Sequence, residues 1–391
     1  MKKIVCILAF VAALSACGKQ DTVYKEFVKA GGYIYPAKPI ELTAISGYER
    51  IILNWQAPMD PSIRTTKLFW DNYTDSLVFS ISDYVDGLLS AEVKDLDDRS
   101  YTFDVVNYDA AGHKSLATEI TTTPFGESWL LSHAERSVVH AEEEEGGAVI
   151  TMSNATDEMV ATQFRYRTTD GQWVESEILE PGENVIHFPN ALRGKLFEYR
   201  SAFHPTNGED DVWFTSWQKS STPIVYKLSV DNWSVSVTQG QEYSTFTCDK
   251  IFDGIVGTNN RWHSSRTSGL NSIFPKILSI DTQAAAGDED VITELDFYMS
   301  PSSTAYRYIR ALSVYIGDEA FNPDDANAKT SYGTPVASDI FNRNEDMQRL
   351  TPKPLKAGRY FAIVFENSYS TSGYIDLWEL VPYGYKASEV E

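Results

Sequence analysis

Apolar residues recur at every second position along this chain, and this alternation sets the fold class. Ile51, Leu53 and Trp55 alternate with other residues, and 101–105 repeats the pattern. A period of two places these side chains on one face of a β-strand, where they can form a core. Residues 226–385 contain similar short strands and no long pattern of helical period. We therefore expect an all-β protein.

Linkers divide this pattern into three segments. Thr121-Thr122-Thr123-Pro124 and Ser220-Ser221-Thr222-Pro223 separate stretches of short strands and turns. Short strands with frequent turns are typical of β-sandwiches, so we expect three in tandem. Their predicted bounds are 37–126, 127–224 and 225–387. In the middle one, Asp170-Gly171 predicts a hairpin turn, and the acidic run 142–145 predicts a solvated loop.

The first residues have the pattern of a secretory signal. Lys2 and Lys3 precede an apolar stretch, residues 4–14, that is too short to span a membrane. Leu14-Ser15-Ala16-Cys17 resembles the lipobox of bacterial lipoproteins. That resemblance implies a signal peptide over 1–16, acylation of Cys17 and a stalk over 17–36. The alternative is an ordinary signal peptide with an incidental cysteine.

The net charge limits which macromolecules the chain can bind, and the cysteine count limits its disulfides. The formal net charge is −22, and loss of Lys2 and Lys3 with the signal changes it to −24. Such a chain is not attracted electrostatically to nucleic acid or to an anionic membrane surface. Of three cysteines, Cys6 would leave with the signal and Cys17 would be acylated, so Cys248 has no partner for an intramolecular disulfide.

The first sandwich resembles a fibronectin type III domain. The resemblance rests on Leu42, Trp55, a corner from Leu96 to Tyr101, and Asp109-x-x-Gly112. It implies that Trp55 and Tyr101 lie in the core. The middle sandwich repeats the strand pattern at 197–201, which predicts a second domain of the same kind.

The same region resembles the opening domain of an uncharacterised family of Bacteroidetes lipoproteins. That family is associated with polysaccharide utilisation, so the resemblance implies a role in glycan uptake. The matching residues are Tyr24-x-x-Phe27, Gly32-x-Ile34-Tyr35-Pro36, Gly47-x-x-Arg50-x-x-Leu53-x-Trp55, Asp60-Pro61-Ser62 and Trp70-x-Asn72.

The last sandwich resembles the discoidin domain, also called the coagulation factor 5/8 type C domain. The resemblance covers nearly the whole segment and implies a jelly-roll sandwich. Its residues are Trp233-x-Val235, Phe252-Asp253-Gly254, Thr258-x-x-x-Trp262-His263-Ser264, Phe274-Pro275, Ile280-Asp281, Arg359-Tyr360 and Trp378-Glu379-Leu380.

One loop of this sandwich is rich in oxygen ligands. Asp253 and Thr258 carry side-chain oxygens, and Gly254 and Gly257 allow a tight turn. Such loops suit a hard cation such as calcium. The resemblance adds Glu379 as a ligand and implies a structural calcium ion. The alternative is a loop held by hydrogen bonds alone.

Two further loops carry candidate glycan contacts. Carbohydrate-binding members of the discoidin family use loops at one end of the sandwich, where aromatic rings and polar side chains meet the sugar. This resemblance implies ligand-binding residues on two loops, whereas we expect Trp262 in the core. The residues are His263, Arg266, Asn271, Asn367, Tyr369 and Tyr374.

These features together predict a lipid-anchored glycan-binding protein of the outer membrane, facing the cell surface. We expect a monomer whose partners are a polysaccharide or oligosaccharide and other outer-membrane glycan-uptake proteins. The alternative is a structural or protein-binding surface lipoprotein. We do not expect an enzyme: no nucleophile motif appears, and the acidic residues 288–290 are predicted to be a solvated turn.

Overall fold

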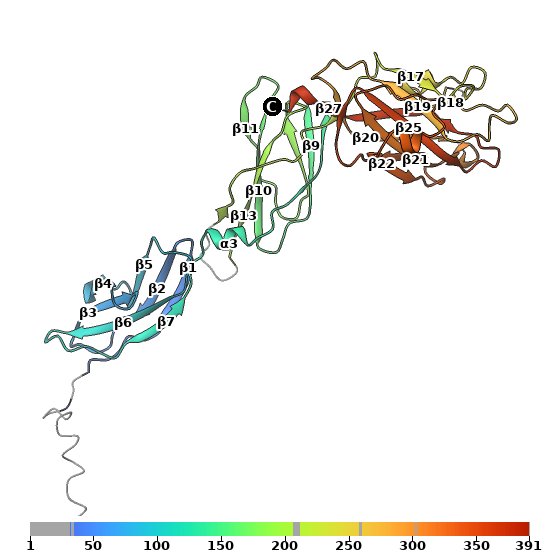
Figure 1. The fold of residues 1–391 in the computed structure, drawn as a ribbon. Coiled ribbons are helices and arrows are strands. Elements are labelled where there is room, and N and C mark those ends of the chain that lie inside the picture. The colour runs from blue at the N-terminus through green and yellow to red at the C-terminus, as the bar shows by residue number, and fades with distance from the viewer. Residues whose placement is uncertain (1–31, 33–34, 206–211, 258–259, 302, 391) are drawn as a thin grey trace, which may run out of the picture. The chain divides into compact units, whose positions relative to one another are not determined.

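The computed structural model describes residues 32, 35–205, 212–257, 260–301 and 303–390. Within these ranges the chain is all-β, with antiparallel sheets and only short helices, as the alternation predicted (Figure 1). No helix of the described ranges is long and apolar enough to cross a membrane. Cys17 and Thr258 lie outside the described residues.

Contacts divide the chain into two compact units. The first unit comprises Met1–His133 together with His204–Trp213. The second unit comprises Ala134–Phe203 and Phe214–Glu391. The first sandwich therefore belongs to one unit, and the middle and C-terminal sandwiches share the other. Each sandwich has its own main cluster of buried apolar side chains.

The N-terminal sandwich has two antiparallel sheets, with strand orders β1-β2-β5 and β4-β3-β6-β7. Its elements are β1 (Thr43–Gly47), β2 (Arg50–Gln56), β3 (Ile63–Trp70), β4 (Asp75–Ser80), η1 (Ile81–Asp83), β5 (Leu88–Val93), β6 (Tyr101–Asp109) and β7 (Thr118–Thr122). Trp55 is fully buried and donates its indole N–H to the Tyr84 hydroxyl at 2.8 Å. Tyr101 is also buried, and its hydroxyl accepts the Asp97 N–H at 3.0 Å. The predicted core positions of both aromatics are confirmed.

The middle sandwich follows the short helix α3 (Glu127–Leu131) and also has two sheets. One has the order β12-β9-β8, and the other runs β11-β10-β13-β14, with β15 paired to β13. Their bounds are β8 (Val138–Glu144), β9 (Gly147–Met152), β10 (Met159–Arg167), β11 (Trp173–Glu175), β12 (Val185–Pro189), β13 (Glu198–Phe203), β14 (Trp213–Phe214) and β15 (Gln218–Lys219).

Three residues of the acidic run lie in a strand and not in the predicted loop, whereas Glu145 lies in the turn that follows it. Glu142, Glu143 and Glu144 belong to β8 and pair with Val149, Ala148 and Gly147 of β9. The run is tolerated in a strand because basic side chains meet it: Arg193 contacts Glu143, and His187 contacts Glu144. The hairpin at Asp170-Gly171 is as predicted, since it joins β10 to β11.

The C-terminal sandwich packs two five-stranded sheets. One has the order β16-β27-β20-β23 with β24 paired to β20, and the other has the order β17-β19-β25-β21-β22. The first comprises β16 (Tyr226–Lys227), β20 (Asp290–Tyr298), β23 (Met347–Leu350), β24 (Ala357–Gly358) and β27 (Glu379–Lys386). The second comprises β17 (Ser234–Val237), β19 (Lys276–Asp281), β21 (Ile309–Gly317), β22 (Ala337–Ile340) and β25 (Tyr360–Ser368). The remaining elements are η2 (Cys248–Phe252), β18 (Trp262–His263), η3 (Thr304–Tyr306), α4 (Ala328–Ser331), β26 (Asp376–Leu377) and η4 (Ala387–Glu389).

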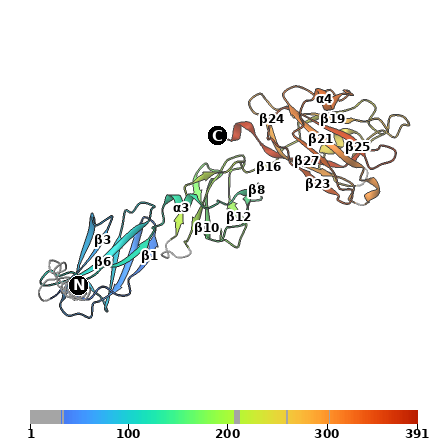
Figure 2. The same ribbon diagram turned by 60° about the horizontal axis from the view of Figure 1, so that its bottom comes forward.

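Apolar side chains fill both faces of the second of these sheets. The inner face belongs to the main core, where Trp262 is fully buried as predicted. On the outer face, Ala328 of α4 packs with Ile277 and Tyr315. Figure 2 labels α4 together with β19 and β21 of this sheet. This double burial makes the sheet a rigid base for the loops at its ends.

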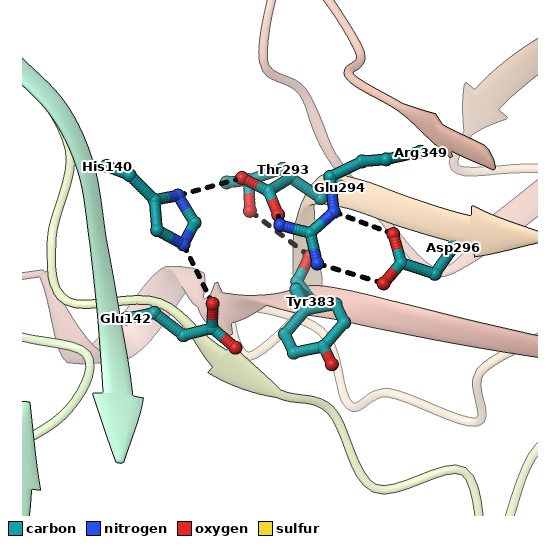
Figure 3. A network of polar contacts seen from close by, with 7 residues as sticks. All are labelled: His140, Glu142, Thr293, Glu294, Asp296, Arg349 and Tyr383. Atoms are coloured by element: carbon teal, nitrogen blue, oxygen red, sulfur yellow. Dashed lines mark hydrogen bonds and ion pairs between the residues drawn. The ribbon is translucent and has the colours of Figure 1, made fainter. Parts of the chain in front are cut away.

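A polar network joins the middle sandwich to the C-terminal one (Figure 3). His140 of β8 contacts Glu142 at 2.8 Å and Glu294 of β20 at 3.1 Å. Arg349 binds the same Glu294 and forms a two-pronged contact with Asp296 at 2.6 and 2.9 Å. The two carboxylates around His140 raise its pKa to about 9. At neutral pH the ring is therefore a cation that bridges two carboxylates.

Replacing His140 with Gln should weaken this junction by about 1 kcal/mol at pH 7, because a charged hydrogen-bonded bridge is lost at a partly exposed site. The pKa of the folded state lies above that of a free imidazole. The stabilisation is therefore complete below about pH 6.5 and disappears as the pH rises through 9. Thermal unfolding should distinguish H140Q from wild type at pH 7 but not at pH 10. An equal difference at both pH values would contradict this role, and His187→Gln is the exposed control.

Candidate functional site

The candidate site forms where two short strands meet at one end of the C-terminal sandwich. β18 and β26 pair in an antiparallel sense, with His263 opposite Asp376. The loop after β18 and the loop before β26 carry four of the six predicted ligand-binding residues, and His263 belongs to β18 itself. Pairing of these strands brings those loops together from positions more than a hundred residues apart.

His263 is the centre of the site but does not reach its surface. Its side chain is fully buried, its Nδ1–H donates to the Ser264 carbonyl at 2.6 Å, and its Nε2 accepts from Arg266 at 3.2 Å. Burial lowers the His263 pKa to about 4, with the nearby Arg266 and Arg261 charges acting in the same direction. The ring is therefore neutral above that pH and orients Arg266.

Arg266 and four tyrosines form what we call the tyrosine face. The Arg266 guanidinium lies 4.7 Å from the Tyr243 ring centroid and 5.9 Å from that of Tyr374. Tyr308 stands 6.0 Å from Tyr374, and Tyr306 is 6.4 Å from Tyr308. Arg266, Tyr243 and Tyr306 are exposed, whereas Tyr308 and Tyr374 are half-buried. The face thus offers a row of rings beside one oriented guanidinium.

A buried ion pair lies next to His263, because Asp376 is opposite His263 in the pairing of β18 with β26. Asp376 is fully inaccessible, and its Oδ1 lies 2.9 Å from Nε of Arg261. Arg261 also stacks on Phe246 and Trp378, at 4.5 and 5.1 Å from their ring centroids. Burial raises the Asp376 pKa to about 7 despite the arginine. This carboxyl group therefore depends on Arg261 to stay ionised.

The two loops touch through Gly373 and Asn271. Gly373 has φ +73°, and a Cβ there would clash with the Asn271 carbonyl oxygen. The same oxygen accepts a hydrogen bond from the buried Lys276 ammonium at 2.9 Å, and burial lowers the Lys276 pKa to about 8. The main chain of Asn271 is thus fixed beside Tyr374, while its side chain is half-exposed.

Tyr369 and Asn367 are placed differently from the other predicted residues. The Tyr369 hydroxyl donates to the Phe341 carbonyl at 2.8 Å, and its N–H donates to the Tyr308 carbonyl at 2.8 Å. Tyr369 therefore holds Tyr308 in position at the edge of the tyrosine face. Asn367 lies within β25 opposite Ala311, and its buried Oδ1 has no partner among the described residues.

The sequence missed Tyr243, Tyr306, Tyr308, Arg261 and Asp376. Alternation at Tyr306-x-Tyr308 ahead of β21 is a local signal, but it does not reveal which loops these rings face. Asp376 follows Tyr374 by two residues, yet its importance comes from Arg261, which lies far away in the sequence. The site's members become visible only when β18 and β26 are paired.

The predicted calcium ligands that can be described lie in a separate cleft. Glu379 is 4% exposed, its Oε1 accepts the Gly254 N–H at 3.1 Å, and its Oε2 is buried with no hydrogen-bond partner among the described residues. Asp253 accepts hydrogen bonds from the Ile255 N–H and from Asn260. Burial, helped by Asp253, raises the Glu379 pKa to about 7.

Glu379 and Asp253 line a cleft of about 720 Å³ together with Trp233 and Asp290. Asp290 belongs to β20, is 1% exposed and pairs with Lys386 at 2.8 Å, so the predicted solvated turn at 288–290 is wrong for this residue. The described residues hold no group of three or more His, Cys, Asp or Glu side chains able to bind a metal. The buried and unpartnered Glu379 oxygen nevertheless fits a cation whose other ligands are carbonyl or hydroxyl oxygens.

Comparison with known proteins gives one family match and several structural neighbours. The family DUF4998, described as a domain of unknown function, matches residues 17–211. That range includes the segment in which the sequence resembles an uncharacterised lipoprotein family. No curated protein matches the sequence.

The structural neighbours include carbohydrate-binding modules and a SusE-like protein. The family 32 carbohydrate-binding module of C. perfringens NanJ, in complex with galactose, is 16% identical with a TM-score of 0.32, covering 41% of this chain and 99% of its own. The C-terminal domain of a chitobiase from Bacteroides fragilis is 17% identical with a TM-score of 0.32, covering 41% and 98%. The SusE-like protein is 12% identical with a TM-score of 0.35, covering 64% and 97%.

Proposed function

We propose that this chain is a glycan-binding protein whose carbohydrate site is the tyrosine face. The observation that carries this proposal is the position of Arg266, stacked beside Tyr243 and Tyr374 and oriented by the neutral His263. Aromatic rings stack on the apolar faces of sugar rings, and a guanidinium donates several hydrogen bonds to hydroxyl oxygens. A pre-oriented arginine binds with a smaller loss of side-chain entropy than a free one.

The finer parts of the proposal concern location and calcium. The lipobox-like sequence before Cys17 supports anchoring to the outer membrane, with the C-terminal sandwich presented at the cell surface. The unpartnered Glu379 oxygen supports a structural calcium ion held by Glu379, Asp253 and nearby carbonyl oxygens. When bound, the ion would neutralise these carboxylates and tie the loop after η2 to the start of β27.

Replacing Arg266 with Ala should weaken glycan binding by at least about tenfold, because the oriented donor at the centre of the face is lost. The test is a glycan array with the full chain, followed by calorimetry of the best ligand with R266A. Arg64→Ala, at an exposed position on β3, is the matched control. Because His263 is neutral above about pH 4, protonation of this ring should not change the wild-type affinity between pH 5 and 8.

Two results would contradict the proposal. One is a glycan that binds wild type and R266A equally well, since the tyrosine face would then be the wrong site. The other is a folded wild-type protein that binds no glycan on the array but retains an outer-membrane protein. That second result would favour the alternative of a protein-binding lipoprotein.

A further inference from the structure

The middle sandwich carries a second cluster of aromatic and basic side chains, on the outer face of its five-stranded sheet. Five side chains alternate there in a ladder of rings and guanidinium groups. The members in order are Trp173, Arg165, Trp217, Arg200 and Phe214. Arg165 and Arg200 lie 4.6 and 4.4 Å from the Trp217 ring centroid, and Arg200 lies 4.3 Å from that of Phe214. We call this set the arginine ladder.

Strand register explains why the ladder is rigid. Phe164 and Tyr166 of β10 point into the core, so Arg165 and Arg167 point outward. Gln163 accepts two hydrogen bonds from Arg200, at 2.6 and 3.0 Å, and Glu198 binds Arg165. Each of these guanidinium groups is held by rings on its face and by polar atoms on its edge.

Trp173 projects from this ladder and forms a wall of two hollows. Its side chain is 48% exposed. One hollow of about 430 Å³ is also lined by Arg165, Val174 and Glu175. A smaller hollow of about 120 Å³ includes Arg167 and Lys219. The Arg167 guanidinium lies 5.2 Å from the indole centroid, so a ligand that stacks on the exposed part of the indole lies close to this cation.

The charge of this surface is opposite to that of the chain. The two hollows include the basic residues Arg165, Arg167, Lys195 and Lys219 and the acidic residues Glu175 and Glu198. The whole chain carries −22. Glu198 is bound to Arg165, whereas Arg167 and Lys219 form no ion pair with any described residue. Two uncompensated cations therefore flank Trp173.

From this arrangement we propose that the face around Trp173 is a second carbohydrate site, selective for an anionic polysaccharide. The indole stacks on a sugar ring, and Arg167 and Lys219 bind the carboxylate or sulfate groups of that sugar or its neighbour. Two cations suit a carbohydrate, because stacking on the indole supplies part of the binding and few ion pairs are needed. Nucleic acid is held mainly by many phosphate contacts, which two cations do not supply. This site is independent of the tyrosine face.

The test is affinity electrophoresis of the full chain in gels containing polygalacturonate, with neutral dextran as the comparison polymer. Wild type should be retarded by polygalacturonate and not by dextran, and retardation should decrease as salt rises from 50 to 300 mM. Trp173→Ala should weaken binding at least about tenfold, and Arg167→Gln several-fold with a weaker dependence on salt.

Matched controls separate the site from general effects. Tyr73→Ala removes an exposed aromatic from the N-terminal sandwich, and Lys114→Gln removes one positive charge there. Relative to a gel without polymer, both variants should be retarded by polygalacturonate as much as wild type. Trp173→Phe keeps an aromatic ring and should still bind polygalacturonate, which separates loss of the ring from misfolding of W173A. R266A should also bind polygalacturonate, because the tyrosine face is a separate site. Equal retardation by dextran, tighter binding to single-stranded DNA than to polygalacturonate, or unchanged binding by W173A and R167Q would each overturn the proposal.

Discussion

Replacing Asp376 with Asn is expected to lower the free energy of unfolding of the C-terminal sandwich by about 3–5 kcal/mol at pH 8. The reason is that Arg261 would keep its charge in a nearly inaccessible position with no carboxylate 2.9 Å away. Urea unfolding of the full chain should show this as an early loss of the C-terminal transition. Asp318→Asn, at an exposed position, should stay within about 0.5 kcal/mol of wild type.

Replacing the arginine of this ion pair should give a loss of stability that depends on pH. In Arg261→Met the remaining carboxyl group can become neutral by taking up a proton, and its pKa is already raised by burial. R261M should therefore cost less stability at pH 5 than at pH 8. A loss below 1 kcal/mol in D376N, or no pH difference in R261M, would mean that the ion pair does not support the site.

Calcium is expected to raise the melting temperature of the C-terminal sandwich, and more at pH 8 than at pH 5.5. A ligand at a hundred times its dissociation constant stabilises by about 2.7 kcal/mol. The Glu379 pKa of about 7 lies above that of an unfolded glutamate. Without metal, the stability that Glu379 contributes is complete below about pH 4.5 and is lost as the pH rises through 7. Calcium binds the ionised carboxylate and so acts where that loss is greatest.

Glu379→Gln separates the metal from the burial of the charge. Without calcium, E379Q should be at least as stable as wild type at pH 8, because the unfavourable buried charge is gone. With calcium, wild type should gain stability and E379Q should not. Identical melting curves of wild type in calcium and in chelator at pH 8 would refute the calcium proposal. A gain in E379Q equal to that of wild type would place the ion elsewhere.

Local patterns predicted the strands well because they depend on near neighbours. The alternation at Ile51, Leu53 and Trp55 corresponds to β2, in which those three side chains are fully buried. The acidic residues were predicted less well. Glu143 and Asp290 resembled solvated loop residues in sequence, but Arg193 and Lys386 lie beside them in the fold. A charge that is compensated by a distant residue leaves no mark in its own segment.

In the candidate site, too, the sequence indicated residues that the fold then arranged in a way that no local pattern shows. His263 and Arg266 were selected together, and the fold keeps them together while giving them different tasks: His263 is buried and orients the exposed Arg266. Both residues of β18 are fully buried, and the place of the exposed Arg266 beyond them follows from the pairing of β18 with β26. A two-residue strand has no periodicity from which that pairing could be predicted.

The sequence by itself determined the all-β class, the tandem sandwiches and core residues such as Trp55 and Trp262, because burial every second residue is a local property of a strand. Only the tertiary structure decided the members of the two proposed surfaces. The tyrosine face collects Tyr243, Arg266, Tyr308 and Tyr374 from four separate segments, and the arginine ladder depends on the register of β10 with β11 and β13. Such contacts are set by strand pairing over long sequence distances, which no local pattern encodes.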